Sequence, residues 1–488
     1  MAILRTVQPT FFKKAALQTS SLPPQDKVSV AVGQTLDVQY AFRVGNHCLV
    51  NLVRPLGTVG QLGYFFLPHV QVTLQELRAV WLTNVDSEVL NSRSNLQQAL
   101  ATLNALGFNT LYPVVWNRGF TLYPSSIAQE FTGASVMPNS SFENRDMLAE
   151  LIEAAKPFNF RVIPWFEYGL KAPPNSPIAA RNPHLITADV QGNEIKNDTV
   201  WLNPTHPEVQ QFMIDLIADL VARYEVAGVQ LDDNFGLPTE LGYDSFTRAL
   251  YRQTNQDQSM PLNPRDPVRV QWLTDQITGL FRRIFRVTKS RRDALISLSP
   301  NPLGFSRQNY AVDWQLWERE GLVEELVLQV YRSSLASFTA EIDKPEVTEA
   351  RFHIPVAIGV LTGLRTQAVS FSSIREQVQT TRQKQFAGSS CFFYETLFYE
   401  QLSPQKVVRN ASDLQTLFPA NSATRGADLQ KTTVPDASQD APLQESMPDL
   451  IAGRIEAEVK PQSNWIVLIS RFISSLLSSF ISNLTSRR

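Results

Sequence analysis

Acidic side chains follow several strand-like segments of this sequence, at the point where each segment ends. Glu167 follows the third such segment, Asp232 and Asp233 follow the fourth, and Glu395 follows the eighth. Hydrolysis of a glycosidic bond needs two carboxyl groups: one protonates the leaving oxygen, and the other attacks the anomeric carbon or activates water. These acids are therefore candidate catalytic residues, provided that the fold brings the strand ends together.

The double aspartate raises the question of which carboxyl group faces the site. Side chains alternate along a strand, so Gln230 and Asp232 should point one way, and Leu231 and Asp233 the other. This favours Asp232 as the nucleophile or base, with Glu167 or Glu395 as the acid. Asp233 stays open as an alternative, because the alternation can fail at a strand end.

Aromatic and amide side chains near the same strand ends could bind a sugar. A single aromatic residue more often belongs to the core, so only Trp116 and Trp165, which adjoin polar residues, are expected to reach the pocket. The candidate substrate-binding residues are Trp116, Asn117, Arg118, Trp165, Tyr168, Gln230, Asn234 and Tyr331.

Other kinds of chemistry find less support. The five histidines form no H-x-x-x-H pair and the two cysteines lie far apart, so no zinc site is expected. Asp232-Asp233-Asn234 offers oxygen ligands for Ca²⁺ or Mg²⁺ but lacks the spacing of an EF-hand. No nucleotide-binding glycine motif follows the first strand, and no G-x-S-x-G elbow is present. We predict neither metal nor cofactor. A net charge of −2 gives no indication of nucleic-acid binding, which usually requires an excess of basic residues.

Strand-like and helix-like segments alternate through the central part of the chain, which favours a parallel sheet with crossover helices. The sequence therefore predicts a (β/α)₈ TIM barrel, with catalytic groups at the C-terminal strand ends. An open doubly wound sheet is the alternative that periodicity leaves open. The predicted strands are 78–82, 109–116, 161–166, 228–231, 294–298, 326–330, 353–358 and 389–394.

Composition divides the chain into four parts. Residues 1–73 hold short β-like runs with Gly and Pro, and predict a small SH3-like β module. Residues 77–418 form the barrel domain. Residues 419–462 are rich in Ala, Ser, Pro and Gln and predict a flexible linker. Residues 463–488 predict an amphipathic C-terminal helix.

The C-terminal helix could contact a membrane. Arg471 and recurring serines interrupt its apolar stretch, which favours a helix lying in a membrane surface over one that spans the bilayer. Docking on the barrel or in an oligomer is the other alternative. The N-terminus shows no secretory signal, so we expect a cytoplasmic or peripheral-membrane location.

Several motifs resemble a known family. RAVWLTNVDSEVL, LNALGFNTLYPVVWNRGFTLYPS and WLNPTHPEVQQFMIDLIADLVARYEVAGVQLDDNFGLP are similar to the bacterial family called glycosyl-hydrolase family ten-like, over about residues 77–400. The resemblance implies a TIM barrel that hydrolyses glycosidic bonds, with peptide-free peptidoglycan glycan strands as the substrate. It also maps the family's double aspartate onto Asp232 and Asp233. The chain departs from the family at Glu167, where relatives often have Asn.

The N-terminal segment resembles an SH3-like module of cyanobacterial proteins, found beside wall-acting enzymes, and this implies a binding role. A second function remains open: a catalytically silent barrel that binds glycan and is tethered at a membrane. The fifth predicted strand favours it, because Ser299 and Asn301 stand at its end without a carboxylate.

Overall fold

The computed structural model describes residues 2–74, 76–292, 294–351 and 353–418. The predicted linker 419–462 and the predicted helix 463–488 lie outside the described residues. Within these residues, no helix is both long enough and apolar enough to cross a membrane.

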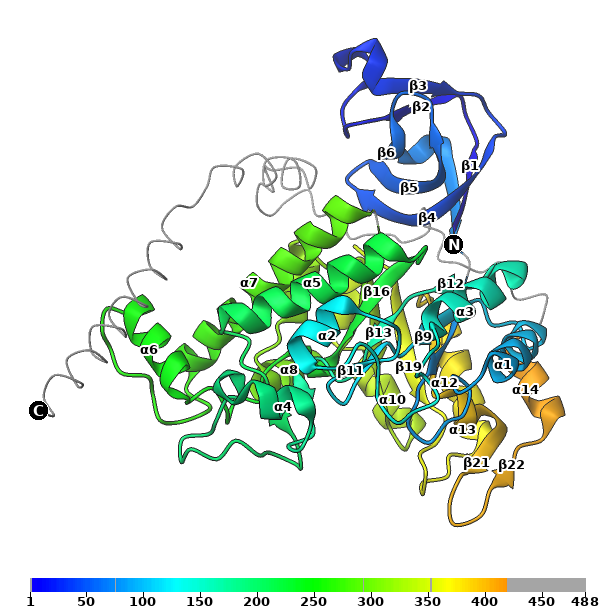
Figure 1. Cartoon of the computed structure of the whole chain (residues 1–488). Helices are drawn as coiled ribbons and strands as arrows, with labels where there is room; N and C mark the ends of the chain where they lie inside the picture. Colours follow the sequence, from blue (N-terminus) through cyan, green and yellow to red (C-terminus); the bar gives the residue numbers. More distant parts are fainter. Residues whose placement is uncertain (1, 75, 293, 352, 419–488) are drawn as a thin grey trace, which may run out of the picture.

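A curled parallel sheet forms the centre of the molecule (Figure 1). Its order is β12-β9-β8-β20-β19-β18-β17-β16-β13. Residues 161–166 pair with β9 through their first part and with β16 through their last part, so the sheet curls back on itself. The strands are β8 (Leu77–Leu82), β9 (Thr110–Pro113), β12 (Arg161–Val162), β13 (Trp165–Phe166), β16 (Gly228–Asp232), β17 (Leu295–Ser299), β18 (Glu325–Gln329), β19 (Val356–Leu361) and β20 (Gly388–Phe392).

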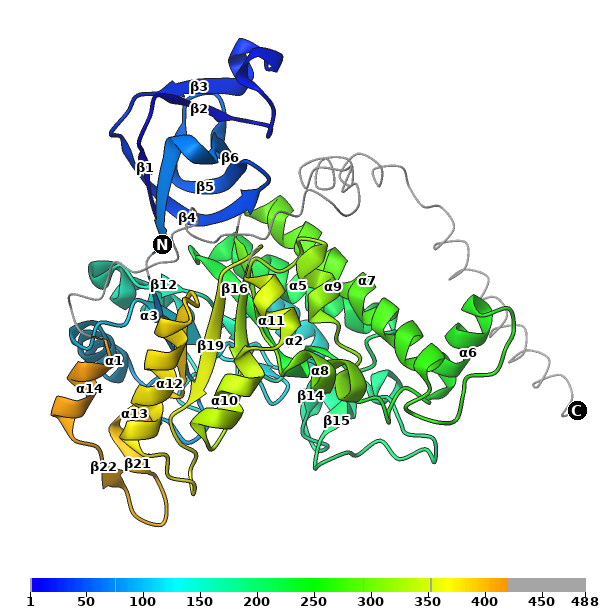
Figure 2. The same ribbon diagram turned by 180° about the vertical axis from the view of Figure 1, so that it is seen from behind.

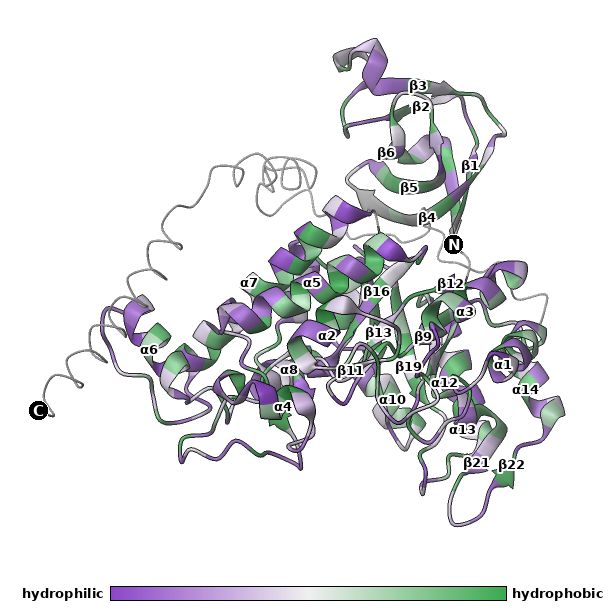
Figure 3. Cartoon of the chain, in the orientation of Figure 1, coloured by the Kyte–Doolittle hydropathy of each residue, from purple (hydrophilic) through white to green (hydrophobic). Residues whose placement is uncertain are grey.

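Helices cover the outside of this sheet, and the view from behind shows α9 to α12 on the far side (Figure 2). Hydrophobic and hydrophilic bands alternate along α5 and α7, as expected for helices that bury one face (Figure 3). On α5 one apolar face is buried, formed by Phe212, Leu216, Leu220 and Val221. The helices are α1 (Arg93–Ala105), α2 (Ser126–Thr132), α3 (Met147–Ala155), α4 (Pro177–Arg181), α5 (Pro207–Arg223), α6 (Ser245–Thr254), α7 (Pro267–Arg291), α8 (Leu303–Tyr310), α9 (Trp314–Arg319), α10 (Leu335–Ile342), α11 (Pro345–Ala350), α12 (Phe371–Gln383), α13 (Tyr394–Phe398) and α14 (Ala411–Leu417).

Three strand ends differ from the sequence expectation. The second strand stops at Pro113, and residues 116–117 instead form β10 (Trp116–Asn117), which pairs with β11 (Phe120–Thr121). The seventh strand is displaced toward the C-terminus, beginning after Pro355, which has no N–H to donate. The eighth strand stops at Phe392, so Glu395 lies in the first turn of α13.

An antiparallel sheet with its own core precedes the parallel sheet. Phe12 and Phe65 stack at 5.0 Å in this core, whereas Leu49 and Tyr64 pack into the core of the parallel sheet. These strands lie above the curled sheet in both views (Figures 1 and 2). The strands are β1 (Ala2–Thr6), β2 (Thr10–Lys13), β3 (Lys27–Val30), β4 (Thr35–Val44), β5 (His47–Leu56), β6 (Gly60–Phe66) and β7 (Val70–Leu74), in the order β3-β2-β6-β5-β4-β1-β7.

Candidate active site

Asp232, the last residue of β16, points to the inner face of the curled sheet. Two residues earlier, Gln230 Nε2 donates to Ser297 Oγ on the neighbouring strand at 3.0 Å. Asp232 Oδ1 accepts from Ser299 Oγ, one step further along the same two strands, at 3.1 Å. Gln230 and Asp232 therefore share a face, in agreement with the alternation expected from the sequence.

The carboxyl group of Asp232 is held by neutral donors in a buried environment. Asp232 is 4% exposed. Its Oδ1 also accepts hydrogen bonds from Gln329 Nε2 at 2.7 Å and from the backbone N–H of Asp233 at 2.9 Å. Burial raises the pKa of Asp232, because desolvation disfavours the charged form. The nearby charges of Asp233 and Glu167 raise this pKa further.

Asp233 lies in a different environment. It begins a short 3₁₀ turn, η6 (Asp233–Phe235), and it is only partly buried. Its Oδ2 accepts from Asn301 Nδ2 at 2.7 Å, and its Oδ1 is 3.4 Å from Asn234 Nδ2. The two consecutive aspartates thus offer one deeply buried carboxyl group and one more accessible carboxyl group.

Glu167 follows β13 and faces the double aspartate. Its Oε2 accepts from Asn117 Nδ2 at 2.5 Å. Burial raises the pKa of Glu167 to about 7, even though the charge of Lys171 and the Asn117 hydrogen bond act in the opposite direction. A carboxyl group with this pKa is substantially protonated at neutral pH, as a general acid requires.

A tight turn holds Glu167 against the η6 segment. Asn234 Nδ2 donates to the backbone carbonyl of Glu167 at 2.9 Å. Two residues later Gly169 has φ +51°, and a Cβ there would lie 2.2 Å from the carbonyl oxygen of Asn234. Glycine therefore permits both the left-handed turn and the close approach.

Tyr331 lies beside the same acids. Burial raises the pKa of its phenol, and the charges of Asp232, Asp233 and Glu167 raise it further. Its ring lies 5.4 Å from that of Phe392. The charges of the three carboxyl groups all act on this phenol, so Tyr331 lies within electrostatic range of each of them.

The structure holds Glu395 through other partners. Its Oε1 accepts from Ser87 Oγ at 3.1 Å and from the backbone N–H of Glu88 at 3.0 Å. The carboxylate thereby joins α13 to the loop after β8. A catalytic role for Glu395 stays a prediction.

The two tryptophans expected in the pocket are buried. Trp116 is fully buried, donates from Nε1 to the carbonyl of Gly169 at 2.8 Å, and so braces the turn that carries Glu167. Trp165 is 2% exposed and packs near Trp81, with ring centroids 6.2 Å apart. Its Nε1–H has no hydrogen-bond partner among the described residues.

The remaining predicted binding residues divide between the surface and the interior. Arg118 is exposed, and its charge acts to lower the pKa of Glu167. The Lys171 ammonium lies 4.6 Å from the centre of the Tyr168 ring. Gln230 is fully buried and accepts from Trp81 Nε1 at 2.8 Å, which suits a packing role.

Sequence reasoning missed the neutral residues that hold the aspartates. Ser299, Asn301 and Gln329 all stand at strand ends, but they carry no charge, and no role in holding a carboxyl group was expected of them. Their shared position was the available signal. Within the described part of the chain, no group of His, Cys, Asp and Glu suits a metal ion.

The family model and the curated relatives both point to glycosyl hydrolases. A family model described as Glycosyl hydrolase-like 10 matches residues 76–381. The glycosyl hydrolase DigH of Escherichia coli K12 is 24% identical over an alignment of 340 residues, and the match covers 59% of this chain and 74% of the relative. The glycosyl hydrolase YngK of Bacillus subtilis is 23% identical over 297 residues, covering 53% of this chain and 54% of the relative.

Among solved structures, the catalytic domain of beta-amylase from Paenibacillus polymyxa is similar with a TM-score of 0.50 and 11% identity, covering 72% of this chain and 99% of that chain. That likeness concerns the fold alone. The family model, in contrast, covers more than half of this sequence. The chain therefore belongs to the glycosyl hydrolase-like 10 family and is a glycosidase.

Proposed function

We propose that this glycosidase cleaves the glycan strands of peptidoglycan from which the peptides have been removed. The main support for hydrolysis is that Glu167, Asp232 and Asp233 lie at neighbouring strand ends. In addition, the pKa of Glu167 is raised to about 7. The substrate rests on the family resemblance. We also infer that the curled sheet is a complete (β/α)₈ barrel, whose sites lie at the C-terminal strand ends.

In this proposal Glu167 protonates the leaving oxygen, because burial keeps its proton available at neutral pH. Asp232 and Asp233 act as a pair. Burial and the nearby charge of Asp233 raise the pKa of Asp232, because a second negative charge beside the first is unfavourable. A carboxylate of this pair either attacks the anomeric carbon or activates water, and Asn301, Ser299 and Gln329 orient it.

Two further assignments belong to the same proposal. The N-terminal strands form an SH3-like module that binds wall polymer. Residues 463–488 contact a membrane surface, and deleting them should release the protein from sedimented membranes. Unchanged sedimentation after the deletion would refute the membrane contact.

The function is tested by mass spectrometry of purified peptide-free strands incubated with the enzyme. Shortened oligosaccharides are expected from the unsubstituted protein and from Glu153→Gln, a matched change on the exposed surface of α3. They should form at least about a hundredfold more slowly with Glu167→Gln and with Asp232→Asn. Intact strands with the unsubstituted protein would overturn the substrate, and product formation by both active-site variants at the rate of the unsubstituted protein would overturn the assigned roles.

The stereochemistry of the product distinguishes the two forms of this mechanism. Proton NMR of the first product reports whether the anomeric configuration is retained or inverted. Retention requires direct attack by the aspartate pair, and inversion requires water between the pair and the sugar.

A further inference from the structure

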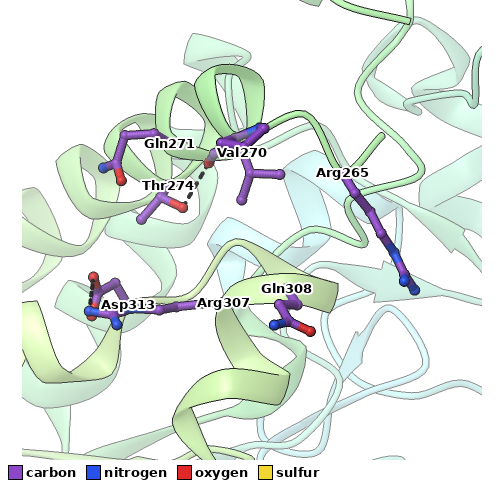
Figure 4. A pocket seen from close by; sticks show the side chains of 8 residues that line it. Arg265, Val270, Gln271, Thr274, Arg307, Gln308 and Asp313 are labelled. Carbon is purple, nitrogen blue, oxygen red and sulfur yellow. Dashed lines mark hydrogen bonds and ion pairs between the residues drawn. The ribbon is translucent and has the colours of Figure 1, made fainter. Parts of the chain in front are cut away.

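A cleft with a volume of about 470 Å³ lies between the start of α7 and the end of α8. Val270 and Gln271 line it from α7, Gln308 lines it from α8, and Arg265 lies at one end (Figure 4). Its volume falls within the range of small-molecule sites. None of the residues that line it belongs to the acid cluster described above.

A rigid loop connects the cleft to Asp233. The N–H groups of Leu237 and Thr239 donate to the carbonyls of Tyr310 and Asn309 at the end of α8, at 2.9 and 3.0 Å. On the other side, the buried Arg269 of α7 donates to the carbonyl of Thr239 at 2.7 Å. Both walls of the cleft are thereby bound to the loop that continues from the η6 turn.

Two aromatic side chains belong to α8, the helix that forms one wall of the cleft. Tyr310 is partly exposed, and the charge of Asp233 contributes to raising the pKa of its phenol. Phe305 is 50% exposed, with its ring centroid 6.0 Å from that of Tyr310. Aromatic faces combined with a few polar groups are the usual lining of ligand sites.

The cleft carries a cation without a partner. Arg307 is paired with Asp313 at 2.6 Å. Arg265 is exposed, and its guanidinium makes no ion pair or hydrogen bond within the described residues. A guanidinium group binds a carboxylate through two parallel hydrogen bonds, so this end of the cleft suits an acidic group.

We propose that the α7–α8 cleft is a distal subsite that binds a carboxylate-bearing sugar of the glycan, with Arg265 as the anion ligand and Phe305 and Tyr310 as the sugar-stacking path. This rests on the proposed function and deepens it. Removing the peptide from a glycan strand leaves a free carboxylate on the sugar, whereas an attached peptide converts that group into a neutral amide. The subsite therefore favours peptide-free strands.

The test measures binding, so that it does not depend on cleavage. The full chain carrying Glu167→Gln is titrated by calorimetry with oligosaccharides from peptide-free strands, and with the same oligosaccharides after their carboxylates are converted to primary amides. Arg265→Gln should weaken binding of the carboxylate form about tenfold and that of the amide form less than about twofold. Phe305→Ala should weaken binding of both forms. Arg93→Gln, an exposed arginine on α1, is the matched control and should change neither.

Equal affinities of the Arg265→Gln protein and its parent for the carboxylate form would overturn the proposal, and so would an equal loss for both forms. Failure of the parent protein to bind either form would overturn it as well. In that case, cleavage of the same strands by the unsubstituted enzyme shows whether the proposed function survives without the subsite.

Discussion

Two groups of buried acids lie at opposite ends of the same curled sheet, and their partners differ. Glu325, at the start of β18, is 2% exposed and accepts from Arg161 Nη1 at 3.0 Å and from the Tyr112 hydroxyl at 2.8 Å. Asp232, at the end of β16, is buried almost as deeply, but its hydrogen-bond partners are neutral. A buried carboxylate paired with a cation holds the fold together, whereas one without a cation retains a raised pKa and a proton to exchange.

The largest difference between the two ends should appear in catalysis. Glu167→Gln should lower kcat/KM by about two to four orders of magnitude, because it removes the proton donor. Glu325→Gln should leave the kcat of the folded enzyme nearly unchanged. Initial rates on peptide-free strands, normalised to the folded fraction, measure both. Comparable losses of kcat in Glu167→Gln and Glu325→Gln would show that the two ends of the sheet do not differ in function.

The free energy of unfolding should depend more on the ion pair of Glu325 than on the acids of the active site. Arg161→Met leaves the buried Glu325 without its cation and should lower the free energy of unfolding by about 3–5 kcal/mol. Urea denaturation followed by circular dichroism measures this. A change below about 1 kcal/mol would mean that the pair does not stabilise the fold.

The raised pKa of Glu167 predicts a stability that depends on pH. The folded protein holds this proton up to about pH 7, whereas the group's ordinary pKa is 4.5, so its stabilising contribution is complete below pH 4.5 and is lost as the pH rises through 7. From pH 4.5 to 8 the protein should lose about 1–3 kcal/mol relative to Glu167→Gln. Urea denaturation of both proteins at the two pH values measures it. Parallel pH curves would contradict the prediction.

The same proton predicts how the rate depends on pH. Activity should fall as the pH rises through about 7, because the acid loses its proton. A rate that stays constant from pH 6 to 9 would exclude Glu167 as the acid.

The neutral donors at the active end should have a smaller effect. Gln329→Met removes the hydrogen bonds to Asp232 and to the carbonyl of Ser299, and should lower kcat about tenfold. Loss of a donor to the carboxylate raises the pKa of Asp232 further, so the acid limb of the pH–rate profile should move to higher pH. An unchanged acid limb would show that Gln329 does not act through Asp232.

Glu395→Gln should have the smallest effect. The amide oxygen of Gln can still accept from Ser87 and from the N–H of Glu88, so kcat should stay within about twofold. A hundredfold loss would instead establish Glu395 as a catalytic acid.

Local patterns predicted the orientation of Asp232, because it depends on an alternation that neighbouring residues of the strand share. They could not predict the partners of Glu325. Arg161 lies 164 residues away, and Tyr112 lies 213 residues away. They also placed Trp116 in the pocket, although its indole braces the turn after Glu167.

The order of strands and the acids at their ends could thus be inferred from the amino-acid sequence alone, because hydrophobic runs and their polar ends are properties of short segments. Which acids share a site, and which proton is retained at neutral pH, depended on how the sheet curls. Only that curvature brings Glu167, Asp232 and Asp233 near one another and joins Glu395 to a different loop. Burial and nearby charge set a pKa, and both arise from segments that lie far apart in the chain.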